Sequence, residues 1–167
     1  MTVVIRPETS ADVPVISRVT HAAFQSTSRD RVTEHRIFEA LRRNGALSLS
    51  LVVVDDGHVV GHVAVSPVSI SSGASGWFGL GPISVLPARQ RQGIGTRLME
   101  RALAMLLQRG ARGCVLVGEP AFYGRFGFAP KVGLEYPSVP AKFFLALPFG
   151  PERPSGTVQY DAAFAES

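Results

Sequence analysis

Two glycines separated by one apolar residue follow an apolar segment and a basic turn, and they carry the strongest chemical signal in the chain. Residues 83–86 read Ile-Ser-Val-Leu, and residues 87–96 continue as Pro-Ala-Arg-Gln-Arg-Gln-Gly-Ile-Gly-Thr. Glycine lets a backbone approach a ligand closely, and the first amides of a helix lack an acceptor within the helix. With the positive end of the helix dipole and the nearby Arg89, Arg91 and Arg97, these amides predict a site for a phosphate or pyrophosphate.

The residues present bear on three other interpretations of the glycine pair. A tight strand-to-helix turn without a ligand stays open, because Gly-x-Gly is a common pattern. A dinucleotide-binding fingerprint needs a third glycine where this chain has Leu98. A Walker loop needs a terminal Gly-Lys-Ser/Thr, which the sequence lacks.

The elements that must position this loop can be predicted from hydrophobic periodicity and turn residues. The expected strands cover residues 3–6, 47–54, 59–70 (interrupted by Pro67), 77–86, 114–117, 143–147 and 157–160. The expected helices cover residues 13–23, 32–43, 94–110 and 120–125. Strand 77–86, the glycine loop, the helix after it and strand 114–117 form a βαβ unit, which places two strands in parallel.

Composition favours one globular domain spanning residues 1–167. Hydrophobic residues make up 46% and charged residues 18% of the chain, the range of globular proteins rather than disordered ones. The net charge of +4 comes almost entirely from arginine, since Lys131 and Lys142 are the only lysines. This bias fits either phosphate binding or scattered surface charge. Basic runs with interleaved aromatic residues are absent, so nucleic-acid binding is not expected.

Redox and targeting signals point to a cytoplasmic protein. Cys114 is the only cysteine, and its apolar neighbours predict a buried, inert thiol without a disulfide. A signal peptide and a bilayer-spanning apolar stretch are both missing from the sequence.

Several motifs together resemble the GCN5-related N-acetyltransferase family. They are Ile5-Arg6-Pro7 with Asp12, Val59-Val60-Gly61-His62-Val63-Ala64, Gln-x-x-Gly-x-Gly at 90–95 and Phe122-Tyr123-Gly124-Arg125-Phe126-Gly127-Phe128. They follow the family's order and cover most of the chain, and residues 158–164 resemble poorly characterised bacterial members. The implied fold is a mixed α/β (α+β) one, with a mostly antiparallel sheet, one splayed parallel strand pair and flanking helices.

The resemblance implies that acetyl-CoA is the co-substrate and that no metal takes part. The pantetheine arm would enter the gap between the splayed strands, and the pyrophosphate would lie on the glycine loop. The implied binding residues are Ile83, Ser84, Val85, Gln90, Arg91, Gln92, Gly93, Ile94, Gly95 and Thr96. Arg89, Arg91 and Arg97 are candidates for the remaining phosphates, and the sequence does not choose among them.

The resemblance also assigns Tyr123 as the acid that protonates the departing thiolate, with a packing role as the alternative. Many relatives carry a glutamate in the strand before the glycine loop, but residues 79–85 of this chain contain no carboxylate. The general base therefore stays open between a water relay and two candidate carboxylates, Glu34 and Glu119.

Other residues gave weaker signals. His58 and His62 are expected on one strand face, without the cysteines or carboxylates of a metal site. Phe143, Phe144 and Phe149 fit either an acceptor pocket or the core. The segments that would shape the acceptor site, residues 24–33, 71–77 and 132–147, carry no motif.

The function these signals predict is direct transfer of an acetyl group from acetyl-CoA to a primary amine of unknown identity. The alternative is an acyl-CoA sensor or a non-catalytic subunit with the same fold. The expected partners are acetyl-CoA and an amine-bearing acceptor, with a homodimer left open and no membrane.

Overall fold

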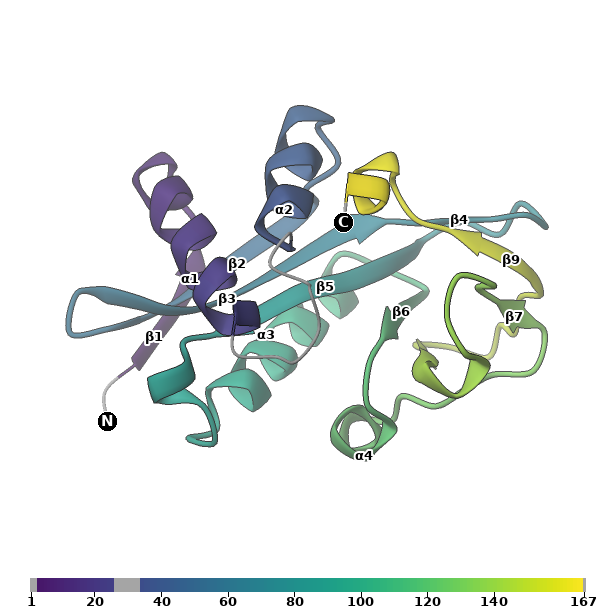
Figure 1. Cartoon of the computed structure of the whole chain (residues 1–167). Coiled ribbons are helices and arrows are strands. Elements are labelled where there is room, and N and C mark those ends of the chain that lie inside the picture. Colours follow the sequence, from purple (N-terminus) through teal and green to yellow (C-terminus); the bar gives the residue numbers. More distant parts are fainter. Residues whose placement is uncertain (1–2, 26–33, 167) are drawn as a thin grey trace.

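The computed structural model describes residues 3–25 and 34–166, and they form a central sheet with helices on both faces (Figure 1). The strands are β1 (Val3–Pro7), β2 (Leu49–Asp55), β3 (His58–Pro67), β4 (Ser69–Ile70), β5 (Trp77–Val85), β6 (Gly113–Val117), β7 (Leu134–Glu135), β8 (Phe144–Pro148) and β9 (Gly156–Gln159). The helices are α1 (Val13–Gln25), α2 (Glu34–Arg43), α3 (Ile94–Gln108) and α4 (Pro120–Tyr123). Short 3-10 turns are η1 (Ser10–Asp12), η2 (Pro87–Arg89), η3 (Gly124–Phe126), η4 (Ala141–Phe143) and η5 (Ala162–Glu166).

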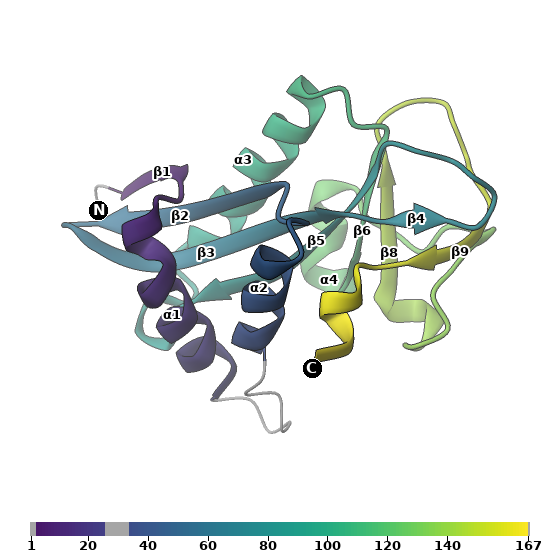
Figure 2. The same cartoon turned by 90° about the horizontal axis from the view of Figure 1, so that it is seen from above.

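The main sheet has six strands in the order β1-β2-β3-β5-β6-β8. Its neighbours are antiparallel except β5 and β6, which run parallel on either side of the α3 crossover. Figure 2 shows α1, α2 and η5 on one side of this sheet, with α3 across it on the other. The fold class expected from the sequence is therefore confirmed, including its mixed, mostly antiparallel sheet.

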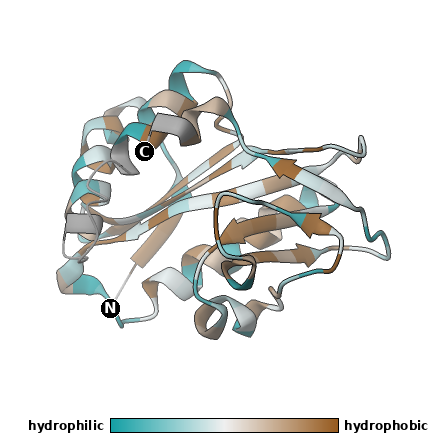
Figure 3. Cartoon of the chain, turned by 45° about the vertical axis from the view of Figure 1, so that its right-hand side comes forward, coloured by the Kyte–Doolittle hydropathy of each residue, from teal (hydrophilic) through white to brown (hydrophobic). Residues whose placement is uncertain are grey.

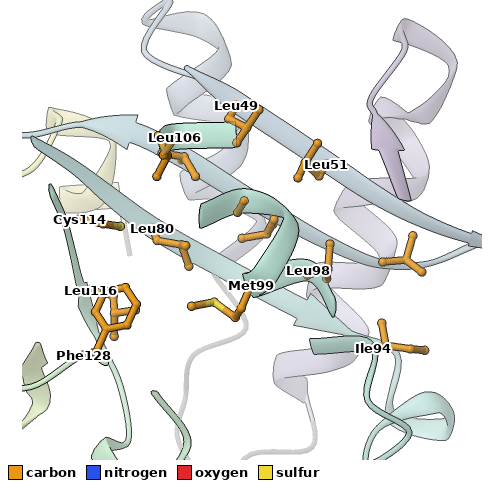
Figure 4. Close-up of a cluster of buried hydrophobic side chains, with 14 of the residues drawn as sticks. Leu49, Leu51, Leu80, Ile94, Leu98, Met99, Leu106, Cys114, Leu116 and Phe128 are labelled. Carbon is orange, nitrogen blue, oxygen red and sulfur yellow. The ribbon is translucent and has the colours of Figure 1, made fainter. Parts of the chain in front are cut away.

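One core layer lies between the sheet and α3. Leu98, Met99 and Leu106 of α3 face side chains of β2, β5 and β6, as Figure 4 shows. Cys114 and Leu116 extend this layer along β6 and pack near Phe128. The apolar spacing after Ile94 predicts Leu98, Ala102, Met105 and Leu106 on one face of the helix. Leu98, Ala102 and Leu106 are buried, and Met105 is partly buried against the same layer. This packing anchors the helix whose first turn holds the glycine loop.

A second layer lies on the opposite face. The α2 residues Ile37, Ala40 and Leu41, expected on one face, are all buried there, together with Ile16 of α1 and Ala163 of η5. Figure 3 shows hydrophobic residues gathered along the strands and hydrophilic ones on turns and outer helix surfaces. In the described residues, no helix is both long and apolar enough to span a bilayer.

A small second sheet, β4-β9-β7, was not predicted. The sequence placed residues 68–70 in one strand with β3, but β3 ends at Pro67 and Ser69 and Ile70 pair with β9 instead. Proline lacks the N–H that would continue the ladder, so the chain leaves the main sheet there. The parallel partner of β9 is β7, whose two residues gave no strand signal.

His58 and His62 were predicted to share one face of a strand, and this prediction is wrong because of the register of the β2–β3 hairpin. A β-bulge shifts the register between Val53 and Val54, so that Val54 pairs with Val59 whereas Val53 pairs with Gly61. The extra residue reverses the alternation of side chains along β3. His62 is consequently buried and His58 exposed.

Candidate functional site

β5 and β6 pair in parallel over a short stretch and then diverge, and the part of β5 beyond this pairing, on the side that faced β6, is called its diverging edge. Their parallel pairing joins Trp77 to Gly113 and ends with Gly79 opposite Val115. In β5, Gly81 and Pro82 stand opposite a single residue of β3, because Val63 pairs with Ile83 and Val65 with Leu80. Because the bulge adds one residue to β5 and none to the paired part of β3, it bends β5. β5 continues beside β3 up to Val85, while β6 continues beside β8 (Figure 2).

The β5 backbone directs polar groups to its diverging edge, where the pairing with β6 has ended. The Leu86 amide donates to the Val60 carbonyl at 3.0 Å, so residues 86 and 84 have their backbone groups directed at β3. By the alternation of an antiparallel ladder, the amides and carbonyls of Ile83 and Val85 point away from β3, to the diverging edge. The side chain of Gln90 already reaches this side, where its Nε2 donates to the Val85 carbonyl at 3.1 Å.

Ser84 differs from its two neighbours. Its backbone faces β3, and its hydroxyl is buried 3.3 Å from the Thr20 hydroxyl of α1. The structure therefore directs the backbone groups of Ile83 and Val85 to the diverging edge, and the polar groups of Ser84 elsewhere.

The glycine loop has the geometry of an anion site. Arg91 has a φ of +64° and Gly93, the N-cap of α3, a φ of +82°, both in the left-handed region. A Cβ added to Gly93 would meet nothing within 4 Å, so the space before the helix is open. Ile94 is buried and fixes the first turn, while Gly95 and Thr96 are partly exposed. First-turn amides next to an open space offer donors and a positive dipole end to an anion.

Side chains from the loop itself hold its shape. Gln92 Nε2 donates to the Ala88 carbonyl at 3.3 Å, and Arg89 Nε donates to Gln92 Oε1 at 3.0 Å. Arg89 also forms an ion pair of 2.7 Å with Asp55 of the β2–β3 hairpin. Through these contacts Arg89 holds the loop against the hairpin, whereas Arg91 and Arg97 are exposed at the loop.

Arg125 is a fourth arginine at this loop, and the sequence analysis missed it. Its Nη2 donates to Thr96 Oγ1 at 3.2 Å, and its guanidinium lies 4.6 Å from the Phe122 ring centroid. The one signal that could have found it is its position two residues after Tyr123, in a turn whose aromatic residues suit cation–π stacking.

Tyr123 lies on α4, directly after β6. Its ring covers Gly118, where an added Cβ would lie 2.2 Å from the Tyr123 Cε2 atom. It also contacts the rings of Phe122 at 4.8 Å and Phe128 at 6.3 Å. Burial raises the pKa of the Tyr123 phenol to about 12. The hydroxyl therefore stays protonated at neutral pH, as a proton donor must.

The candidate carboxylates are not brought together. Glu119 is exposed at the N-cap of α4 and makes no capping hydrogen bond. Glu34 begins α2, but its side chain lies outside the described residues, as do residues 26–33 of the segment expected to shape the acceptor site. Among the residues that the structure describes, no three His, Cys, Asp or Glu side chains are grouped to hold a metal.

Other candidates lie in the core. Phe144 is 5% exposed and packs against Tyr136 at 5.4 Å, and Phe149 borders the α3 layer. Cys114 is fully buried, and burial raises the pKa of its thiol. A protonated, inaccessible thiol is unsuited to a covalent intermediate.

A family model described as an acetyltransferase (GNAT) domain matches residues 4–130. The chain belongs to this family of acyl-CoA-dependent acetyltransferases, which confirms the resemblance seen in the motifs.

Individual relatives support the same assignment. The uncharacterized N-acetyltransferase YhbS of Escherichia coli is 36% identical over 125 residues, which cover 74% of this chain and 72% of YhbS. A GNAT acetyltransferase from Brucella melitensis, solved with acetyl-CoA, is 47% identical over 98% of both chains, with a TM-score of 0.87. E. coli YhbS solved with CoA aligns at a TM-score of 0.87 with 29% identity, over 98% of this chain and 92% of that one.

Proposed function

We propose that this acetyltransferase binds acetyl-CoA between β5 and β6 and transfers the acetyl group directly to a primary amine. Three features of the diverging part of the sheet together carry the proposal. They are the backbone of Ile83 and Val85 directed to the diverging edge, the open first turn of α3, and the protonated Tyr123. The solved relatives with acetyl-CoA and CoA support the same ligand for this chain.

In the proposed mode, the pantetheine amides pair with the backbone of Ile83 and Val85 as a further strand would. The pyrophosphate lies against the backbone of residues 90–96, with Arg91 and Arg97 beside it. Ligand binding here replaces the Gln90 contact on the Val85 carbonyl or shares that carbonyl, which has two lone pairs.

The chemical step follows from these positions. The amine nitrogen attacks the thioester carbonyl carbon, and the carbon–sulfur bond breaks as the amide forms. Tyr123 gives its proton to the leaving thiolate, and the proton released by the amine passes to water and restores the tyrosine. A water relay takes the base role because residues 79–85 contain no carboxylate.

Tyr123→Phe tests this mechanism because it keeps the ring packed on Gly118 and removes only the proton donor. Turnover of a primary amine found in a broad screen should fall at least about 100-fold, the lower range for general acid catalysis. Calorimetry should show nearly unchanged acetyl-CoA affinity. The matched control is Tyr136→Phe, which removes a hydroxyl on the other face of the sheet and should retain turnover.

Two results would overturn parts of the proposal. Full activity of Tyr123→Phe would make this tyrosine a packing residue. Tight acetyl-CoA binding by a wild-type protein that acetylates no amine would favour the alternative function, an acyl-CoA sensor or non-catalytic subunit, which the missing strand carboxylate supports.

We further propose one domain and a cytoplasmic location. A shared apolar cluster supports the single domain, since Ile70 and Val158 of the small sheet pack with Trp77 and Val115 of the main sheet. Fractionation of cells tests the location, and sedimentation tests whether the protein is a monomer or a homodimer.

A further inference from the structure

A tyrosine outside the described site packs where β5 and β6 begin to diverge. Tyr160 directly follows β9, and its ring packs on Gly79, where an added Cβ would lie 2.5 Å from the Tyr160 Cε2 atom. Gly79 opposite Val115 is the last parallel pair before β5 and β6 diverge. The ring therefore lies at the start of the diverging edge, and only a residue without a side chain at position 79 allows it.

The hydroxyl of Tyr160 is buried and has no hydrogen-bond partner among the described residues. Contacts with the rings of Tyr136 at 5.0 Å and Phe164 at 4.9 Å hold the side chain in place. The hydroxyl is thus not needed to fix the ring. A buried hydroxyl without a partner is unfavourable, and such groups in proteins are usually satisfied by a ligand or water.

The hydroxyl can act there only as a neutral hydrogen-bonding group. Burial, with Cys114 and Tyr136 nearby, raises the pKa of the Tyr160 phenol well above its usual value. A phenol that stays protonated donates to a carbonyl oxygen, and its strength as a donor grows as that oxygen gains negative charge.

The proposed acetyl-CoA orientation brings such an oxygen to this end. The pyrophosphate would lie beyond Val85 at the open end, and Gly79 is six residues away along β5. At the rise of a β-strand this span is about 20 Å, which leaves the thioester end of the ligand nearest to Gly79.

We propose that the Tyr160 hydroxyl donates a hydrogen bond to the acetyl carbonyl oxygen of bound acetyl-CoA and stabilises the charge that develops there during attack by the amine. Tyr160 is then a catalytic residue on the opposite side of the thioester from Tyr123, with one acting on oxygen and the other on sulfur. This inference rests on the proposed function. Removing one such donor from an acyl-transfer site typically lowers turnover by about 100-fold or more.

The test measures the carbonyl stretch of acetyl-CoA labelled with carbon-13 at the acetyl carbonyl. Bound to the wild-type protein, the stretch should shift to lower frequency than in Tyr160→Phe, because a donated hydrogen bond weakens the carbonyl bond. Tyr136→Phe is the matched control, since it alters the same ring cluster and should leave the frequency as in wild type.

Two further measurements separate this role from a structural one. Tyr160→Phe should bind acetyl-CoA more weakly relative to CoA than wild type does, because only acetyl-CoA carries the carbonyl. Without ligand the variant should melt no lower than wild type, since it loses a buried hydroxyl that had no partner.

The outcomes distinguish this inference from the function on which it rests. A wild-type protein that does not bind acetyl-CoA overturns both. A wild-type protein that binds it with a carbonyl frequency independent of Tyr160→Phe overturns the role of Tyr160 alone.

Discussion

Arg125 Nη2 and Thr96 Oγ1 lie 3.2 Å apart, and this hydrogen bond joins the Tyr123 segment to the first turn of α3. The two elements are otherwise separated in the chain by the whole of α3 and β6. Gly95 also approaches this segment, since an added Cβ would lie 3.8 Å from Phe122 Cζ. The proposed phosphate site and the proposed acid are therefore joined by direct contacts.

We predict that Arg125→Ala lowers acetyl-CoA affinity by about 10- to 150-fold, the loss expected for a hydrogen bond to a charged group. The guanidinium lies beside the helix turn that would receive the pyrophosphate, so its removal takes a positive charge from the ligand. The loss should shrink as salt rises, because this arginine is exposed. Calorimetry at low and high salt measures both effects.

Arg112→Ala is the control for net charge. Arg112 is exposed and pairs with Glu152 at 3.0 Å, away from the glycine loop. Equal affinities of the two variants would mean that Arg125 contributes only general charge.

The glycine loop shows how far sequence reasoning reaches. The order strand, loop, helix and strand in residues 77–117 is local, and each element carries its own periodicity, so the parallel pair was predictable. The divergence of β5 from β6 follows a bulge in β5 opposite β3. Because β3 lies outside residues 77–117, the patterns within that segment do not reveal this pairing. Non-local pairing is also why the sequence missed the small sheet, in which β9 joins β4 to β7.

The site residues divide in the same way. Tyr123 and the loop glycines were found because their motif is continuous in sequence. Arg125 was missed because its partner Thr96 is 29 residues away. Arg89 was grouped with the other loop arginines because nothing local reveals its ion pair with Asp55 on the hairpin.

Gly95→Val should separate ligand binding from stability. Gly95 lies inside α3, and a Cβ added to it would meet only Phe122 Cζ, at 3.8 Å. A larger side chain therefore fits the protein but fills space beside the proposed phosphate site. We expect at least about a 10-fold loss of CoA affinity, equivalent to roughly 1.4 kcal/mol. Gly93 is a poorer probe, because its φ of +82° would strain any side chain.

Ala104→Val is the matched control for placing a β-branched residue in the same helix. Ala104 is exposed in α3, remote from the loop, and its substitution places the same side chain in the helix without changing CoA affinity. Calorimetry together with thermal melting of both variants checks the prediction. If Gly95→Val binds CoA as wild type does, the open first turn is not the phosphate site.

His62 should make stability fall in mild acid. The ring is fully buried beside Phe38, at 4.3 Å, and its Nε2 lies 2.7 Å from Ser50 Oγ. Burial, with Arg42 nearby, lowers the pKa of His62 to about 3, against 6.5 for the ordinary group. Between these two values the unfolded chain binds a proton that the folded chain does not. The contribution of His62 is therefore fully present above pH 6.5 and is lost as the pH falls toward 3.

The expected slope from this one group approaches about 1.4 kcal/mol per pH unit between pH 6 and pH 4. Asp12, whose pairing with Arg6 lowers its pKa to about 2, loses its contribution only below its ordinary value of 3.8 and does not account for this range. Urea unfolding of wild type, His62→Gln and the exposed control His58→Gln at several pH values measures the slope. The slope should flatten in His62→Gln alone, and an unchanged slope in that variant would show that other groups set the acid sensitivity.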